Sequence, residues 1–187
     1  MTTGFRSRHG VVSATFVADE VRLLRGLVGE LVELIYDDVP PRRSEVAEDS
    51  LAAIVGDLGS PEPPEDAVLQ RLFPTAYEDD DESAGDFRRF TERGLRDGKV
   101  KNAELVLESL GDPEYSDQVT VSLNPEETQS WLRTFTDLRL ALGTRLGVEQ
   151  DDEDAWEKLP EEDPRRHVYG VYVWLGWVQE SLIQSLS

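Results

Sequence analysis

Six basic side chains lie within the fifteen residues from Phe87 to Lys101, in a chain that is otherwise strongly acidic. This segment, FRRFTERGLRDGKVK, contains two acids, Glu92 and Asp97. Clustered arginine and lysine side chains bind phosphates or carboxylates, so the segment suits nucleic acid or an acidic protein surface. The alternative is that these bases pair with acidic loops of the same chain. The predicted partner-binding residues are Arg88, Arg89, Arg93, Arg96, Lys99 and Lys101.

Two runs of carboxylates, Glu78–Glu82 and Asp151–Asp154, raise the question of a metal site. A calcium loop of the EF-hand type needs a glycine at its sixth position and a glutamate at its twelfth. Counted from the first aspartate of the second run, the sixth residue is Trp156; counted from Asp79, it is Ala84. We therefore predict solvated loops that cap helices, and no metal site.

Nucleophiles and bases of other kinds are few. The chain has no cysteine and two histidines, His9 and His167. Disulfides, thiolate zinc sites and cysteine nucleophiles are therefore excluded, and a catalytic triad would need one of the two histidines. The motifs GxxxxGK[ST], GxGxxG and GxSxG are absent from the sequence. We predict a non-enzymatic protein without a cofactor. The alternative is an unrecognised metal-dependent hydrolase, because 39 acids make any chosen carboxylate pair uninformative.

The charge balance limits the classes of partner. The 187 residues include 39 acids and 19 bases, for a net charge of −20. That field repels nucleic acid and anionic membranes, so we expect a protein partner, with nucleic acid disfavoured. The longest apolar run, Val168–Val178, has eleven residues, and a membrane span needs about 20. No apolar signal-peptide core follows the N-terminus, so we expect a cytoplasmic protein without membrane contact.

Hydrophobic patterns divide the first half of the chain into elements. The β-branched run Val11–Val17 predicts a strand, and a helix is expected from Asp19 to about Asp38. Its apolar residues have helical spacing: Val21, Leu24, Val28, Leu31 and Ile35. Shorter helices are expected after Ser44, from Ala67 to Phe73 and around Ala155–Leu159.

From Ala84 to Leu110 the chain is helix-prone, and its glycines predict two helices that meet near Asp97 and Gly98. The alternating run Gln118–Leu123 predicts a second strand in the same small sheet. The residues expected to face inward between these points are Phe87, Phe90, Leu95, Val100, Leu105, Val106 and Leu110.

The segment from Asn124 to Val148 has the signals of a capped amphipathic helix. Asn124 is a good N-cap, proline follows it, and Glu127 stands three residues after the cap. We expect Gly143 to allow a close helix approach and Gly147 to end the helix in the left-handed conformation. The inward stripe consists of Trp131, Leu132, Phe135, Leu138, Leu142 and Leu146.

The last helix, expected from about Pro164 to Leu186, is apolar around most of its girth until Gln179. Such a helix is buried on more than one side. Tyr172, Trp174 and Trp177 therefore belong either to a central core helix or to a helix shared by the core and a homodimer interface, where Trp and Tyr are enriched.

Five segments carry a family resemblance: ADEVRLLRGLVGELVELI, LFPTAYEDD, DFRRFTERGLRDGKVKNAELVLESL, WLRTFTDLRLALGTRLGV and WLGWVQESLIQSL. Together they resemble the actinobacterial domain-of-unknown-function family DUF2017 over nearly the whole chain. The resemblance implies that the gene for this chain lies beside the gene for the N-degron adaptor of the Clp protease. It also implies a link to transcription under oxidative stress. It implies no catalytic residues. Redox sensing through a disulfide is excluded here, because the chain has no cysteine.

We therefore expect residues 1–187 to form a single, predominantly helical α+β domain with a small two- or three-stranded sheet. The expected function is that of a regulatory or interaction protein in stress-related transcription. The first alternative is an accessory protein of Clp-dependent proteostasis.

Overall fold

The computed structural model describes residues 2–37, 64–74, 81–111, 117–148 and 159–187, with only the backbone described for 37 and 81–90. The helices predicted after Ser44 and around Ala155–Leu159 lie outside these residues. None of the described helices has a stretch long and apolar enough to cross a membrane.

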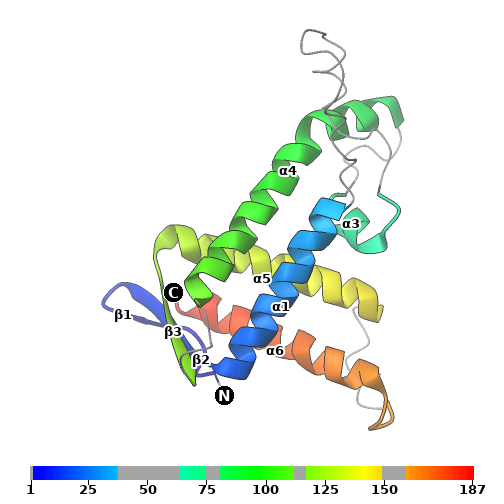
Figure 1. Ribbon diagram of the computed structural model, residues 1–187. Coiled ribbons are helices and arrows are strands. Elements are labelled where there is room, and N and C mark those ends of the chain that lie inside the picture. Colours follow the sequence, from blue (N-terminus) through cyan, green and yellow to red (C-terminus); the bar gives the residue numbers. More distant parts are fainter. Residues whose placement is uncertain (1, 38–63, 75–80, 112–116, 149–158) are drawn as a thin grey trace.

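Two antiparallel helix pairs cross each other and meet a small sheet at one end (Figure 1). The first pair is α1 (Ala18–Asp37) with α4 (Asp81–Leu110), and the second is α5 (Pro125–Leu146) with α6 (Pro164–Gln184). A short helix, α3 (Ala67–Leu72), packs against α5. This architecture confirms the predicted helical α+β fold with one small sheet.

The sheet has three antiparallel strands in the order β1–β2–β3. β2 (Val11–Val17) and β3 (Gln118–Leu123) confirm the two predicted strands, and β1 (Arg6–Arg8) is the third. His9 and Gly10 join β1 to β2, with φ angles of 52° and 79°. Positive φ at both positions is typical of the tightest hairpin turn, whose twist matches that of the strands.

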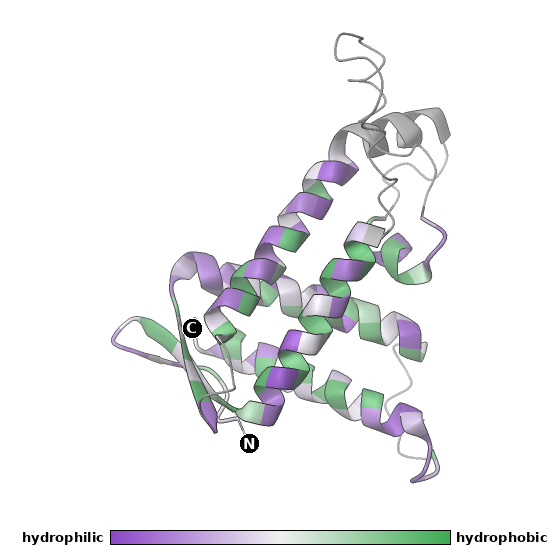
Figure 2. Ribbon diagram, viewed as in Figure 1, coloured by the Kyte–Doolittle hydropathy of each residue, from purple (hydrophilic) through white to green (hydrophobic). Residues whose placement is uncertain are grey.

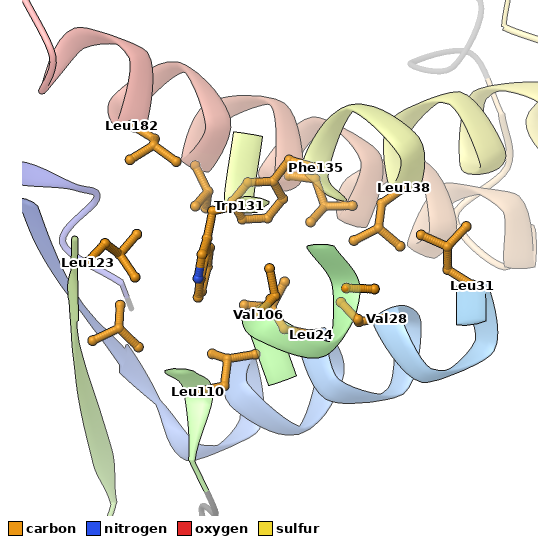
Figure 3. Close-up of a cluster of buried hydrophobic side chains, with 14 of the residues drawn as sticks. Leu24, Val28, Leu31, Val106, Leu110, Leu123, Trp131, Phe135, Leu138 and Leu182 are labelled. Atoms are coloured by element: carbon orange, nitrogen blue, oxygen red, sulfur yellow. The ribbon is translucent and has the colours of Figure 1, made fainter. Parts of the chain in front are cut away.

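The core forms around Trp131, which is fully buried between the helices and the sheet (Figure 3). Its ring stacks on Phe16 at 5.8 Å and meets Phe5 and Phe135 edge-on at 5.3 and 5.4 Å. Its indole N–H donates to the Ser109 hydroxyl at 2.8 Å, so burial leaves no unpaired polar atom on the ring. The apolar series predicted for α1 is buried here: Val21, Leu24, Val28, Leu31 and Ile35.

The predicted ends of α5 are confirmed. The Asn124 side chain accepts a hydrogen bond from the Glu127 backbone N–H at 2.9 Å, and the Glu127 carboxylate accepts one from the Asn124 backbone N–H at 2.8 Å. At the other end Gly147 adopts φ 69°, the left-handed conformation that favours glycine. Gly143 lies close to α6, because a Cβ there would stand 3.5 Å from the Tyr172 ring.

The prediction of two helices between Ala84 and Leu110 is wrong, because α4 is one continuous helix of 30 residues. Gly94 and Gly98 each cost about 1 kcal/mol relative to alanine in a helix interior. Packing of α4 against both α1 and α5 outweighs this cost. Leu95, predicted to face inward, is 51% exposed. Leu105 is half-buried, and the side chains of Phe87 and Phe90 lie outside the described residues.

Candidate interaction surface

Arg96, one of the six predicted partner-binding residues, is buried inside the fold. Its guanidinium donates to the Ile35 carbonyl at 2.7 Å and to the Glu92 carboxylate at 2.7 and 2.9 Å. It also lies 4.4 Å above the centre of the Phe73 ring. These contacts join α4 to the last turn of α1 and to the residue that follows α3. Arg96 therefore has a structural role, and its role in partner binding stays a prediction.

Lys99 is also engaged within the chain. Its Nζ atom lies 2.6 Å from Oδ1 of Asp137 on α5 and 5.9 Å from the centre of the Phe73 ring. Burial raises the pKa of Asp137, and the hydrogen bond and charge of Lys99 lower it only in part. Asp137 was not among the residues predicted from the sequence to form a site. Its signal was a lone acid between the apolar residues Phe135 and Leu138 of the inward stripe.

The other four basic residues are arranged differently. Lys101 is exposed and lies 3.5 Å from a carboxylate oxygen of Glu126, a weak surface contact. Arg93 is exposed, and the side chains of Arg88 and Arg89 lie outside the described residues. The six bases do not form one continuous basic face, because Arg96 and Lys99 point into the fold. The binding of a partner by the others stays a prediction.

A second ion pair fixes α3 on α5. Arg145 lies 2.6 Å from the Asp66 carboxylate, which also caps α3 by accepting from the Val68 backbone N–H at 2.7 Å. Burial raises the pKa of Asp66, but the hydrogen bonds from Arg145 and Val68 outweigh it and hold the pKa below its usual value. Arg145 is thus a structural partner of an N-cap.

The seam between α5 and α6 is polar as well as apolar. Arg139 donates to the Gln179 side chain at 2.9 Å, and its guanidinium lies over the Tyr172 ring at 5.3 Å. Gly176 makes room for it, since a Cβ there would stand 3.4 Å from the guanidinium. Gln179 also donates to Thr136 at 2.9 Å. This network was not predicted from the sequence, although a glycine and a glutamine on an otherwise apolar helix indicated it.

α6 is a surface helix, so the prediction of a central core helix is wrong. It packs on α5 through Leu175, Val178 and Leu182, which are fully buried. Trp174 and Tyr172 are half-buried beside them. α6 carries enough apolar residues for two faces, but the described part of the chain covers only one. The alternative of a helix shared by the core and a homodimer interface stays a prediction.

The opposite side of α6 presents a second apolar face, here called the α6 strip: Tyr169, Val173 and Trp177. Val173 is 51% exposed and Trp177 48% exposed. The strip follows the helical spacing of four residues, and no charged residue lies between His167 and Glu180. Figure 2 shows that hydrophobic residues recur along α6 between its polar ends. A large exposed tryptophan beside an exposed valine is typical of a protein-binding surface.

The enzyme alternative requires side chains that could hold a metal ion or act as a catalytic base. Among them, no group of three or more His, Asp or Glu side chains is placed to hold a metal ion. His9 occupies the hairpin turn, and His167 is exposed in the first turn of α6. The two carboxylate runs weighed as metal sites lie largely outside the described residues.

Comparison with known proteins gives a family. The model for the family described as "Domain of unknown function (DUF2017)" matches residues 2–186. The putative oxidative stress regulator AosR of Mycobacterium leprae is 33% identical to this chain over 181 residues, which cover 89% of this chain and 78% of that protein. The oxidative stress regulator AosR of Mycobacterium tuberculosis is 30% identical with the same coverage. No solved structure matches this chain. The resemblance found in the sequence is thus confirmed, and the chain belongs to the DUF2017 family.

Proposed function

We propose that this protein is a non-enzymatic regulator of transcription under oxidative stress, and that it acts by binding another protein. The α6 strip is the observation that carries the mode of action. Val173 and Trp177 expose apolar surface on a helix whose other face is already packed. The names of the mycobacterial relatives support the biological setting, since they are similar to this chain over 89% of its length.

The electrostatics of the strip support a protein as the bound molecule. A chain of net charge −20 repels other acidic molecules at long range. The α6 strip lacks charge over three helical turns, so a partner can approach there without burying an unpaired ion. Tryptophan is among the residues that contribute most to such contacts.

A gene deletion with matched complementation tests this proposal. The deleted strain is challenged with hydrogen peroxide and complemented with the wild-type gene, with V173S/W177S or with Y36S/L95S. The second variant is the control, because Tyr36 and Leu95 are comparably exposed apolar residues on α1 and α4. We expect the wild type and the control to restore survival and the oxidant-induced transcripts, and V173S/W177S to fail.

Two results would contradict the proposal. The first is a deletion that leaves survival and transcripts unchanged. The second is a deletion that leaves transcripts unchanged but alters the half-lives of Clp substrates, which would place the protein in proteostasis. Circular dichroism of each purified variant separates a binding defect from loss of the fold.

A further inference from the structure

Among the described elements, the helices cover one face of the sheet and leave the other uncovered. Along β2, Val12, Ala14 and Phe16 are buried against the helices, and the residues between them point the other way. Figure 1 shows the helices gathered on one side of the sheet. Side chains alternate between the faces of a strand, so the outer positions of all three strands follow from the register.

Those outer positions carry two arginines, four hydroxyls, Gln118 and two valines, of which Val11 stands opposite Arg8 and is 50% exposed. Arg6 stands opposite Ser13, and Ser13 stands opposite Ser122, so one row crosses all three strands. In the next row the hydroxyls of Thr15 and Thr120 are hydrogen-bonded at 2.9 Å. Arg8 lies on the same face as Arg6, two residues further along β1. We call this surface the sheet patch: Arg6, Arg8, Ser13, Thr15, Thr120 and Ser122.

The sheet patch differs in charge from the rest of the chain. The three strands contain two arginines and no acid, whereas the whole chain has twice as many acids as bases. Asp19 and Asp117 lie beyond the Val17 end of the sheet, at least four residues along β2 from the strand positions of Arg6 and Arg8, or about 13 Å at roughly 3.3 Å per residue. That distance exceeds the screening length of about 8 Å at physiological salt.

Two acids lie just beyond the end of β3, and both have partners within the chain. They begin α5, which follows β3 directly. Glu127 accepts from the Asn124 backbone N–H as part of the capping box, and Glu126 lies near Lys101. Among the described contacts, neither carboxylate pairs with Arg6 or Arg8. The arginine end of the sheet patch is therefore basic and exposed.

We propose that the sheet patch binds an extended acidic segment of the regulatory partner; this inference rests on the proposed function and specifies the chemistry of the partner. Arg6 and Arg8 project from one face about 6.6 Å apart, the repeat of two residues in a strand. Carboxylates two residues apart on an extended peptide have the same spacing. Each guanidinium can bind one carboxylate through two parallel hydrogen bonds, and the hydroxyls can donate to the peptide backbone.

Nucleic acid fits the sheet patch less well. Proteins that bind single strands on a sheet stack bases on aromatic side chains, and the outer positions of these strands carry none. A long polyanion would also meet the acidic surface around the patch, whereas a short acidic segment contacts only the patch.

A defined peptide tests the inference. The probe is a fluorescein-labelled ten-residue peptide of alternating Glu and Ser, measured by fluorescence anisotropy in low salt. Peptides with Gln in place of Glu and a ten-nucleotide single-stranded DNA are the comparison ligands. The variant R6Q/R8Q removes the two guanidinium groups. The control R71Q/R133Q removes the same charge from exposed positions on α3 and α5.

We expect the wild type and R71Q/R133Q to bind the Glu peptide equally and to bind the Gln peptide at least tenfold more weakly. R6Q/R8Q should bind the Glu peptide at least about tenfold more weakly than the wild type does, because it loses two hydrogen-bonded ion pairs. R6K/R8K, which keeps the charge and loses the paired donors, should fall between the wild type and R6Q/R8Q.

Three results would overturn the inference: no binding of the Glu peptide by the wild type, equal binding by the two Gln variants, or tighter binding of the DNA. Light scattering can give a fourth such result. If the wild type and R71Q/R133Q are dimers and R6Q/R8Q is a single chain, a second copy of this chain occupies the sheet patch. These outcomes are independent of the proposed function. For example, the wild-type gene can restore survival of oxidant in the deleted strain while R6Q/R8Q binds the peptide as well as the wild type. That combination would reject the sheet patch and keep the proposed function.

Discussion

The Nζ atom of Lys99 lies 2.6 Å from Oδ1 of Asp137, and this ion pair joins α4 to α5 inside the fold. The Asp137 side chain is 7% exposed and the Lys99 side chain 22% exposed. Burial raises the pKa of Asp137, and Lys99 compensates only part of that cost. The Asp137 carboxyl of the folded protein therefore keeps its proton at pH values at which the unfolded chain has released it.

The two partners should respond differently to substitution. K99M leaves an uncompensated carboxylate in the core and should lower the free energy of unfolding at pH 8 by about 3 kcal/mol, the low end for breaking a buried pair. D137N removes the charge and keeps an acceptor for Lys99, so its cost should be about 1 kcal/mol or less. Urea unfolding of both variants at pH 8 measures the difference.

The pH dependence of K99M supplies a further check. An acid whose folded pKa is raised stabilises the fold when protonated, so its contribution falls as the pH rises from the unfolded toward the folded pKa. The deficit of K99M relative to the wild type should therefore shrink at pH 4.5, whereas that of D137N should grow, because D137N lacks the carboxyl whose protonation stabilises the wild-type fold at low pH. A K99M deficit that is equal at both pH values would contradict the assigned cause.

Arg96 should be essential for stability. R96A removes the buried guanidinium with its hydrogen bonds to Glu92 and to the Ile35 carbonyl, for a loss of about 2–4 kcal/mol. R96K keeps the charge but lacks the planar set of guanidinium donors, so it should recover only part of the lost stability. Thermal unfolding followed by circular dichroism measures both variants. An R96A melting temperature equal to that of the wild type would refute the structural role.

The fold was predictable wherever a local pattern coincided with packing. The apolar residues of α1 repeat at helical spacing and are all buried, and the cap of α5 at Asn124 depends only on neighbouring residues. α4 was not predictable in this way, because its continuity through Gly94 and Gly98 depends on contacts with two helices distant in sequence. β1 was missed as well, since three residues, RSR, have no apolar alternation and pair only because the turn at His9 and Gly10 returns the chain.

The sequence indicated which residues belong to the candidate surfaces, but not which of their side chains face the solvent. The excess of apolar residues on α6 indicated two faces, yet only packing on α5 shows that Trp174 is inward and Trp177 outward. The basic segment failed in the same respect. Its six charges are close in sequence, but a helix distributes them around its axis, so Arg96 and Lys99 meet Glu92 and Asp137 inside the fold.

The two tryptophans of α6 provide a direct comparison. W174A removes a ring that packs partly against the core and should cost about 2–3 kcal/mol, somewhat less than a fully buried aromatic. W177A removes a ring that is 48% exposed and lies beside Gly4, so its cost should be about 1 kcal/mol, well below that of W174A. Urea unfolding of the two variants decides the matter. Equal losses would mean that Trp177 is also part of the core.

Homodimer formation is tested by light scattering at micromolar concentration. If two α6 strips pack together, the measured mass should be twice the 21.1 kDa of one chain. V173S/W177S should then restore the single-chain mass, and the control Y36S/L95S should not. A wild-type mass of 21.1 kDa would exclude the dimer at that concentration and leave the strip to a different protein.

The basic segment leads to the last prediction. Changing Arg88, Arg89 and Arg93 to alanine should weaken binding of the partner recovered with the wild type, because salt-dependent contacts with an acidic surface are lost. The melting temperature should stay near that of the wild type, in contrast to R96A. The matched control replaces Arg22, Arg71 and Arg133, which are exposed elsewhere, and should leave binding unchanged. If the triple variant binds the partner as well as the wild type but is less stable, these arginines only neutralise acids of their own chain. In that case partner binding must depend on other surfaces, of which the α6 strip and the sheet patch are the candidates.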